Sequence, residues 1–220
     1  MTTTLDRPKL GEGTYTFGEA ARILRRSTRT VTNQRLRYWI KTGLSPASRV
    51  ADDGEDVLTF EDLVSLEIVH RLRDEGASLQ SIRRVEVELR RLFPELERPF
   101  AHELFFTDGA SVWAQVHGED AVIEIVGKNR SHYAWRDAIR TFARDIRFEG
   151  PGGKAARWTL SPWVEINPTI QFGAPVVTGT RVAVRTVAAN LEVGTPSEVA
   201  DWYGLREEQV LGVRDYLAAH

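Results

Sequence analysis

The chain has 220 residues, of which 42% are hydrophobic, enough apolar material for one large or two to three small packed cores. It contains no cysteine, which excludes disulfides, thiolate metal sites and cysteine nucleophiles. The formal net charge is −2, no apolar run approaches the ~20 residues that a membrane span requires, and the N-terminal segment lacks the apolar core of a signal peptide. A cytoplasmic protein without membrane contact is expected.

Positive charge is concentrated near the N-terminus. No Asp or Glu occurs between Ala20 and Ala51. The basic residues of this stretch are Arg22, Arg25, Arg26, Arg29, Arg35, Arg37, Lys41 and Arg49. Residues 159–220 have the opposite balance, with 4 basic against 7 acidic residues. Because DNA affinity depends on neutralising phosphates, the basic stretch is the candidate for DNA binding. A solvated basic helix face is the alternative.

Two short helices joined by a tight turn are predicted in this stretch. Thr16 and Glu19 have capping-box spacing and open the first helix. Ser27 or Thr28 is the expected cap of the second helix, which Gly43 ends. The apolar residues that recur at helical spacing in the pair are Ala20, Ile23, Leu24, Leu36, Trp39 and Ile40.

The segments GEAARIL, STRTV and LRYWIKTGL resemble the start of MerR-type winged helix-turn-helix regulators. The resemblance implies that the second helix enters the major groove and that a hairpin wing follows, for which residues 48–58 have a suitable Asp-Gly turn. The chain departs from the pattern by carrying Thr32 to Arg35, about one extra helical turn. The side chains predicted to contact bases or phosphates are Arg22, Arg29, Thr30, Arg35, Arg37, Tyr38 and Arg49. Of the adjacent aromatics Tyr38 and Trp39, one is expected in the core, and Trp39 has the better claim.

Two longer helices are predicted next. Thr59 with Asp62 caps one that ends at Gly76, and Ser78 starts another that closes before Pro94. Their apolar positions are Leu63, Leu66, Val69, Leu72, Ile82, Val85, Leu89 and Leu92. This short seam is more typical of an internal core stripe than of a coiled coil. The long dimer helix usual in MerR-type regulators is therefore absent, and self-association is expected elsewhere.

Residues 101–160 predict a small antiparallel meander, then a helix around Trp135, Ile139 and Phe142, and a turn or linker at Gly150–Gly153. A connecting and dimerising module is favoured for it over a ligand pocket. The last sixty residues predict short strands around a Thr-Gly turn and then three helices. Thr195, Pro196 and Glu198 open the middle helix of the three.

The segment INPTIQFGAPVVTGTRVAV, followed by GTPSEVADWYGLREEQV and RDYLAAH, resembles a small antitoxin domain with the pattern G-x-P-V-V-x-G-T-R-V. With the MerR-like front half, the chain resembles VapB-type antitoxins of VapBC pairs, whose partner is a PIN-like ribonuclease toxin. The resemblance implies a toxin-binding surface. Its candidate residues are Gly179, Thr180, Arg181, Trp202 and Tyr203. Arg181 is predicted either to enter the toxin's acidic metal site or to form a local ion pair, and core packing is the default for Trp202.

No catalytic pattern is found, and the five histidines are scattered, so a protein that is not an enzyme, without cofactor or metal, is predicted. The expected fold is α+β, with a winged helix-turn-helix at residues 14–100, the β-rich module at 101–160 and the antitoxin domain at 161–220. The predicted function is neutralisation of a PIN-like ribonuclease toxin and repression of its own promoter through operator DNA. A homodimer or a higher hetero-oligomer with the toxin is expected. The alternative is a stand-alone MerR-like transcription regulator that responds to a small ligand.

Overall fold

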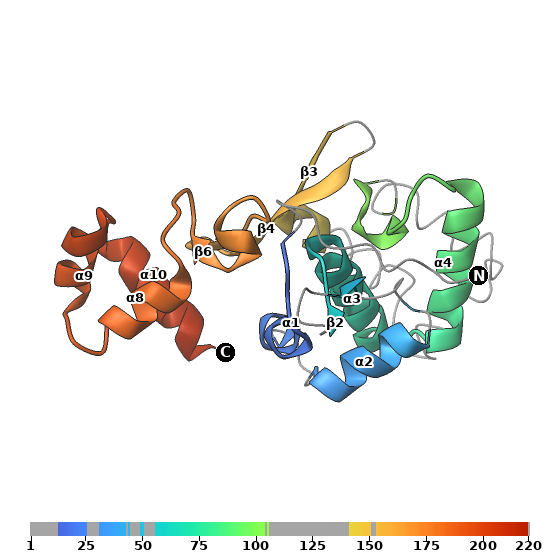
Figure 1. Cartoon of the computed structure of the whole chain (residues 1–220), viewed down its shortest axis with the longest axis horizontal. Helices are drawn as coiled ribbons and strands as arrows, with labels where there is room; N and C mark the ends of the chain where they lie inside the picture. Colours follow the sequence, from blue (N-terminus) through green and yellow to red (C-terminus); the bar gives the residue numbers. More distant parts are fainter. Residues whose placement is uncertain are drawn as a thin grey trace.

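The computed structural model describes residues 13–25, 31–42, 44, 49–50, 56–103, 105, 141–150 and 153–219 (Figure 1). These residues form the predicted α+β fold, with N-terminal helices, a four-stranded antiparallel sheet and C-terminal helices. Most of the predicted meander and of the helix after it lies outside the described residues. None of the helices described is long and apolar enough to cross a membrane.

The first two helices are α1 (Phe17–Leu24) and α2 (Asn33–Lys41). The predicted capping box opens α1: the Glu19 amide donates to the Thr16 hydroxyl at 3.2 Å, and the Thr16 amide donates to the Glu19 carboxylate at 2.9 Å. The predicted cap of the second helix is wrong. Thr32 is the cap, because its backbone is extended (φ −105°, ψ 152°) and its hydroxyl accepts from the Arg35 amide at 3.2 Å. The extra turn in the sequence is therefore the first turn of α2.

The predicted wing is confirmed as a hairpin of β1 (Arg49–Val50) and β2 (Asp56–Val57), which pair antiparallel; its tip lies outside the described residues. Directly after β2, Leu58 exchanges two backbone hydrogen bonds with Tyr15, at 2.9 Å and 2.8 Å. The hairpin is thereby joined to the start of α1, which fixes one end of the wing against the helix pair.

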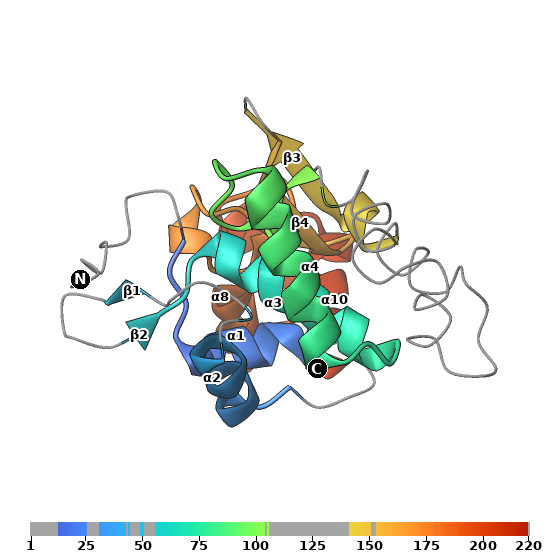
Figure 2. The same cartoon turned by 90° about the vertical axis from the view of Figure 1, so that its right-hand side faces the viewer.

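The centre of the N-terminal part is α3 (Phe60–Asp74), which packs beside α4 (Leu79–Leu92) (Figure 2). Every residue of α3 from Asp62 to His70 is buried, so this helix is enclosed on all sides and does not present one apolar face to a core. On α4 the apolar residues Ile82, Val85 and Leu89 are buried, as predicted for an internal stripe, whereas Leu92 is exposed.

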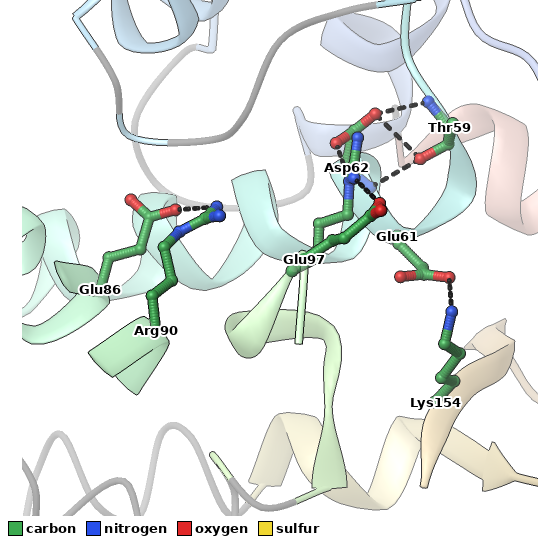
Figure 3. A network of polar contacts seen from close by, with 8 residues as sticks. Thr59, Glu61, Asp62, Glu86, Arg90, Glu97 and Lys154 are labelled. Atoms are coloured by element: carbon green, nitrogen blue, oxygen red, sulfur yellow. Dashed lines mark hydrogen bonds and ion pairs between the residues drawn. The ribbon is translucent and has the colours of Figure 1, made fainter. Parts of the chain in front are cut away.

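A buried polar network fixes the start of α3 (Figure 3). The carboxylate of Asp62 is fully buried; it accepts from the Thr59 amide at 2.9 Å and from Nε of Arg98 at 2.8 Å. Arg98 stands just before the short 3-10 helix η1 (Pro99–Ala101). The ion pair therefore ties the chain after α4 back to the beginning of α3, and it satisfies two charges that burial would otherwise penalise.

The sheet has the order β3-β4-β5-β6. Its strands are β3 (Ile146–Glu149), β4 (Lys154–Ser161), β5 (Val164–Ile166) and β6 (Val176–Val177), all antiparallel to their neighbours. The predicted turn at Gly150–Gly153 joins β3 to β4. The sheet runs across the boundary expected between residues 160 and 161, and the three-part division of the chain stays a prediction.

Three helices follow the sheet: α8 (Val184–Asn190), α9 (Pro196–Tyr203) and α10 (Glu207–Ala218). The predicted capping box at Thr195 opens α9, and Gly204 ends it with a left-handed φ of 63°. Figure 1 shows these helices at one end of the molecule, with the sheet between them and the N-terminal helices.

Tyr15 links the N-terminal helices to the segment before β6. Its buried hydroxyl donates to the carbonyl oxygen of Gly173 at 2.8 Å, and the neighbouring Thr14 amide donates to the Phe172 carbonyl at 3.2 Å. Gly173 has a φ of 84°, and the tyrosine hydroxyl, with the ring carbon that carries it, fills the space that a Cβ atom would need there. The same tyrosine therefore contacts the wing, the start of α1 and the segment before β6.

Candidate nucleic-acid interface

Helix α2 has an apolar inner side and a cationic outer side. Leu36 and Trp39 are buried, and Ile40 packs against the same core. The exposed residues of the helix are Asn33, Gln34, Arg35, Arg37, Tyr38 and Lys41. No acidic residue occurs in α2, and the one carboxylate within α1, that of Glu19, is engaged in the capping box. The outer side of α2 is thus a rigid cationic surface of the kind that a polyanion requires.

Arg37 is held in place by two contacts. Its guanidinium carbon lies 4.4 Å from the centre of the Phe17 ring of α1, and its Nε donates to the Asn33 side-chain oxygen, one turn earlier, at 3.1 Å. Both partners are uncharged, so these two contacts position the side chain without neutralising its positive charge. The side chain stays exposed and available for a phosphate or a guanine edge.

The two adjacent aromatics of α2 divide as predicted. Trp39 is 3% exposed and belongs to the core, whereas Tyr38 is 54% exposed beside the arginines. Arg22 is exposed in the last turn of α1, and Arg35 is exposed on α2. Of the other predicted DNA contacts, Arg29 and Thr30 lie outside the described residues, and Arg49 is placed by its backbone in β1.

The exposed Lys41 in the last turn of α2 was not among the predicted contacts, although it belongs to the acid-free stretch. A cavity of about 200 Å³ beside α2 was also missed. It is lined by Arg35, Tyr38, Trp39, His70, Arg73, Asp74 and Leu79. The signal available in the sequence was the polar set His70, Arg73 and Asp74, whose spacing of three and four places these side chains on one side of a helix.

In the C-terminal part, the predicted toxin-binding loop is a tight turn. The Gly179 amide donates to a Glu165 side-chain oxygen at 3.1 Å, and the Thr180 hydroxyl donates to the Val177 carbonyl at 2.9 Å. Arg181 is exposed, and no carboxylate among the residues that the structure describes lies within ion-pair distance of it. Thr180 therefore has a local structural role, and the alternative of a local ion pair for Arg181 finds no partner in this part of the chain.

The side chains of Trp202 and Tyr203 differ in their exposure to solvent. Trp202 is 53% exposed, so its default place in the core is wrong: its ring lies along Gly194, where an added Cβ would stand 2.6 Å from it. Tyr203 is half-buried, and its hydroxyl accepts from the Asn190 side-chain amide at 2.9 Å. Tyr203 thus joins α9 to α8, and Trp202 contributes an aromatic surface.

Two segments of the chain match known protein families. Residues 15–88 match the MerR HTH family of regulatory proteins, and residues 164–217 match a family described as a protein of unknown function, DUF433. The uncharacterized HTH-type transcriptional regulators Rv1830 of Mycobacterium tuberculosis and Mb1861 of Mycobacterium bovis are each 32% identical over 95 residues. The match covers 42% of this chain and 41% of theirs, less than half of either protein.

The crystal structure of Rv2018 from Mycobacterium tuberculosis has the same fold, with a TM-score of 0.75 and 24% identity. The similarity covers 96% of this chain and 100% of that one, so the arrangement of N-terminal helices, sheet and C-terminal helices is shared over nearly the whole length. The N-terminal part of the chain is therefore similar to the MerR helix-turn-helix family, and its C-terminal part is similar to the DUF433 family.

Proposed function

We propose that this protein is a DNA-binding transcription regulator of MerR type, with α2 as the helix that enters the major groove. The observation that carries the proposal is the outer side of α2, which is exposed, cationic and free of acids, within the segment that matches the MerR family. The proposal is also supported by the two relatives described above, which are named as HTH-type transcriptional regulators. In this role the protein binds operator DNA and catalyses no reaction.

The contacts divide by chemistry. Arg35 and Arg37 can each give two parallel hydrogen bonds to a guanine edge or charge-assisted bonds to phosphates. Tyr38 offers a hydroxyl to the DNA backbone, and Arg22 adds charge from α1. The predicted contacts Arg29, Thr30 and Arg49 complete the proposed interface, with Lys41 added from the exposed end of α2.

Helix-turn-helix proteins usually bind as dimers whose two reading helices lie about one DNA turn apart. The apolar residues Ile82, Val85 and Leu89 of α4 are buried in the N-terminal core, so we do not assign a coiled-coil dimer contact to this helix. We assign dimerisation to another surface, and the β-rich module at 101–160 remains our candidate. Figure 1 shows α8, α9 and α10 at one end of the molecule, apart from α2, and the outer residues of α2 are exposed.

The experiment is a salt titration of binding to the promoter DNA upstream of the protein's own gene. Removing an arginine that binds a phosphate should lower the slope of log affinity against log salt by about 0.9, whereas removing one that reads a base should reduce affinity for the cognate sequence by about 1–3 kcal/mol. The variants are Arg35→Gln and Arg37→Gln. The matched control is Arg214→Gln on α10, which removes an exposed arginine paired with its neighbour Asp215. Unchanged affinity and slope in both α2 variants would refute the assignment of α2.

A second function, neutralisation of a PIN-like ribonuclease toxin by the C-terminal domain, rests on the exposed Arg181 and Trp202. The named relatives are described as regulators, and the DUF433 family has no described function, so the comparisons favour the regulator. The antitoxin role stays a prediction. Its test is co-purification of the full chain with the product of the adjacent gene: Arg181→Glu and Trp202→Asp should each abolish a complex that Arg37→Gln retains.

A further inference from the structure

We propose that the cavity between α2, α3 and the first turn of α4 binds a small aromatic acid, and that its occupation weakens DNA binding. The effect on DNA binding rests on the proposed function, whereas the binding of the acid does not. The ligand class is one aromatic ring carrying one carboxylate or phosphate group. The lining residues come from the proposed reading helix α2 and from the two helices behind it.

The size and floor of the cavity fit a single ring. Its volume of about 200 Å³ slightly exceeds the ~150 Å³ that accommodates benzene in an apolar protein cavity. Trp39 and His70, 3% and 1% exposed, have ring centroids 6.2 Å apart at an angle of 41°, and the half-buried Leu79 closes one side. These groups offer an aromatic ring the tilted and edge contacts that such rings prefer.

The charges of the lining select an anion. Arg35 and Arg73 contribute two positive charges, and Asp74 contributes one negative charge. The Asp74 carboxylate lies 3.8 Å from Nε2 of His70, on the same helix. The guanidinium of Arg73 is held by a hydrogen bond to the Ala77 carbonyl, in the turn between α3 and α4. An acid that contacts both arginines gains charge-assisted hydrogen bonds from two cations and is repelled by the one carboxylate of Asp74, whereas an organic cation would meet two like charges and one opposite charge.

The cavity shares residues with the proposed DNA interface. Arg35 and Tyr38 line the cavity and also belong to the exposed side of α2. An acid bound to Arg35 neutralises one of the cations that α2 presents to phosphates, and DNA bound to Arg35 removes one of the acid's partners. By linkage, each ligand lowers the affinity of the other by the same factor.

The first experiment needs no DNA. Benzoate and phenyl phosphate are titrated into the full-length protein by calorimetry. We expect saturable binding of one molecule per chain that Arg73→Gln weakens by about tenfold or more. Leu79→Trp keeps both arginines but fills the cavity and should abolish binding, whereas Arg84→Gln, on the exposed side of α4, should not change it. Thermal melting checks that every variant is folded. Absence of saturable binding of either acid at concentrations on the order of 10 mM overturns the proposal.

The second experiment repeats the promoter titration with saturating benzoate. We expect benzoate to weaken DNA binding to the wild type severalfold and to have no effect on Leu79→Trp. Benzoate that binds without changing DNA affinity overturns the coupling. If benzoate binds while DNA does not bind at all, the cavity assignment holds and the proposed function fails. If neither acid binds but Arg73→Gln lowers the salt slope by about one, the cavity takes a DNA phosphate and the ligand proposal is refuted.

Discussion

Replacing Tyr15 by phenylalanine tests the link between the two ends of the chain. The substitution keeps the ring and removes only the hydroxyl, which donates to the Gly173 carbonyl at 2.8 Å and is the tyrosine atom nearest to the Gly173 backbone position. A buried acceptor left without its donor costs about 1–3 kcal/mol. For a chain of this size, 1 kcal/mol corresponds to about 2–4 °C in melting temperature, so Tyr15→Phe should melt roughly 2–12 °C lower.

The same variant should change the response to alkali. Burial, and secondarily the charge of Glu19, raises the pKa of Tyr15 far above its ordinary value of 10. The folded state therefore holds this proton more tightly than the unfolded state does. The contribution of protonated Tyr15 to the free energy of unfolding is fully present below pH 10 and is lost as the pH rises above 10. The alkaline loss of stability should accordingly be steeper in the wild type than in Tyr15→Phe.

Urea denaturation between pH 7 and pH 11 measures both effects. Tyr203→Phe is the matched control, because its hydroxyl accepts a bond from Asn190, and that amide also donates to the Thr186 carbonyl. We expect this variant to lose less than about 1 kcal/mol, since the donor retains another partner. The reasoning is refuted if Tyr15→Phe is as stable as the wild type, or if its alkaline slope is unchanged.

Two further substitutions test the packing. Arg98→Ala leaves the carboxylate of Asp62 buried without its cation and should cost about 3–5 kcal/mol in urea denaturation at pH 7; a loss below about 1 kcal/mol would mean that water replaces the guanidinium. Gly212→Ala places a Cβ atom of α10 against the ring of Trp163. This substitution should lower the free energy of unfolding by about 1–3 kcal/mol, measured by thermal melting. Gly18→Ala in α1 is its control: the nearest atom to the new Cβ is a hydroxyl 3.9 Å away, so a gain of about 0.5–1 kcal/mol is expected. Equal effects of the two glycine substitutions would contradict the packing argument.

The local elements could be predicted because their stabilising bonds span three residues. The capping boxes at Thr16, Thr59 and Thr195 each connect a hydroxyl to an amide one turn later, and all three occur where expected. The cap of α2 was misplaced because Ser27, Thr28 and Thr32 are all competent side chains. The structure shows Thr32 in this role, with an extended backbone and its hydroxyl bonded to the Arg35 amide.

The candidate site was predictable in part for the same reason. An acid-free stretch can be read from the residues alone, and helical spacing correctly assigned Trp39 to the core and left Tyr38 outside. The default of core packing was wrong for Trp202, because the missing side chain at Gly194 lets a large ring lie on the surface there. The solvent exposure of an aromatic depends on neighbours that helical periodicity does not contain.

The sequence by itself determined where α1, α3, α4 and α9 begin, where charge gathers and that the fold is α+β, since these follow from short-range bonds and composition. Only the tertiary structure decided which distant residues meet. Tyr15 and Gly173 are 158 positions apart, and the cavity beside α2 takes its arginines from two different helices. Such contacts depend on how whole elements pack, and many packings are compatible with one local pattern.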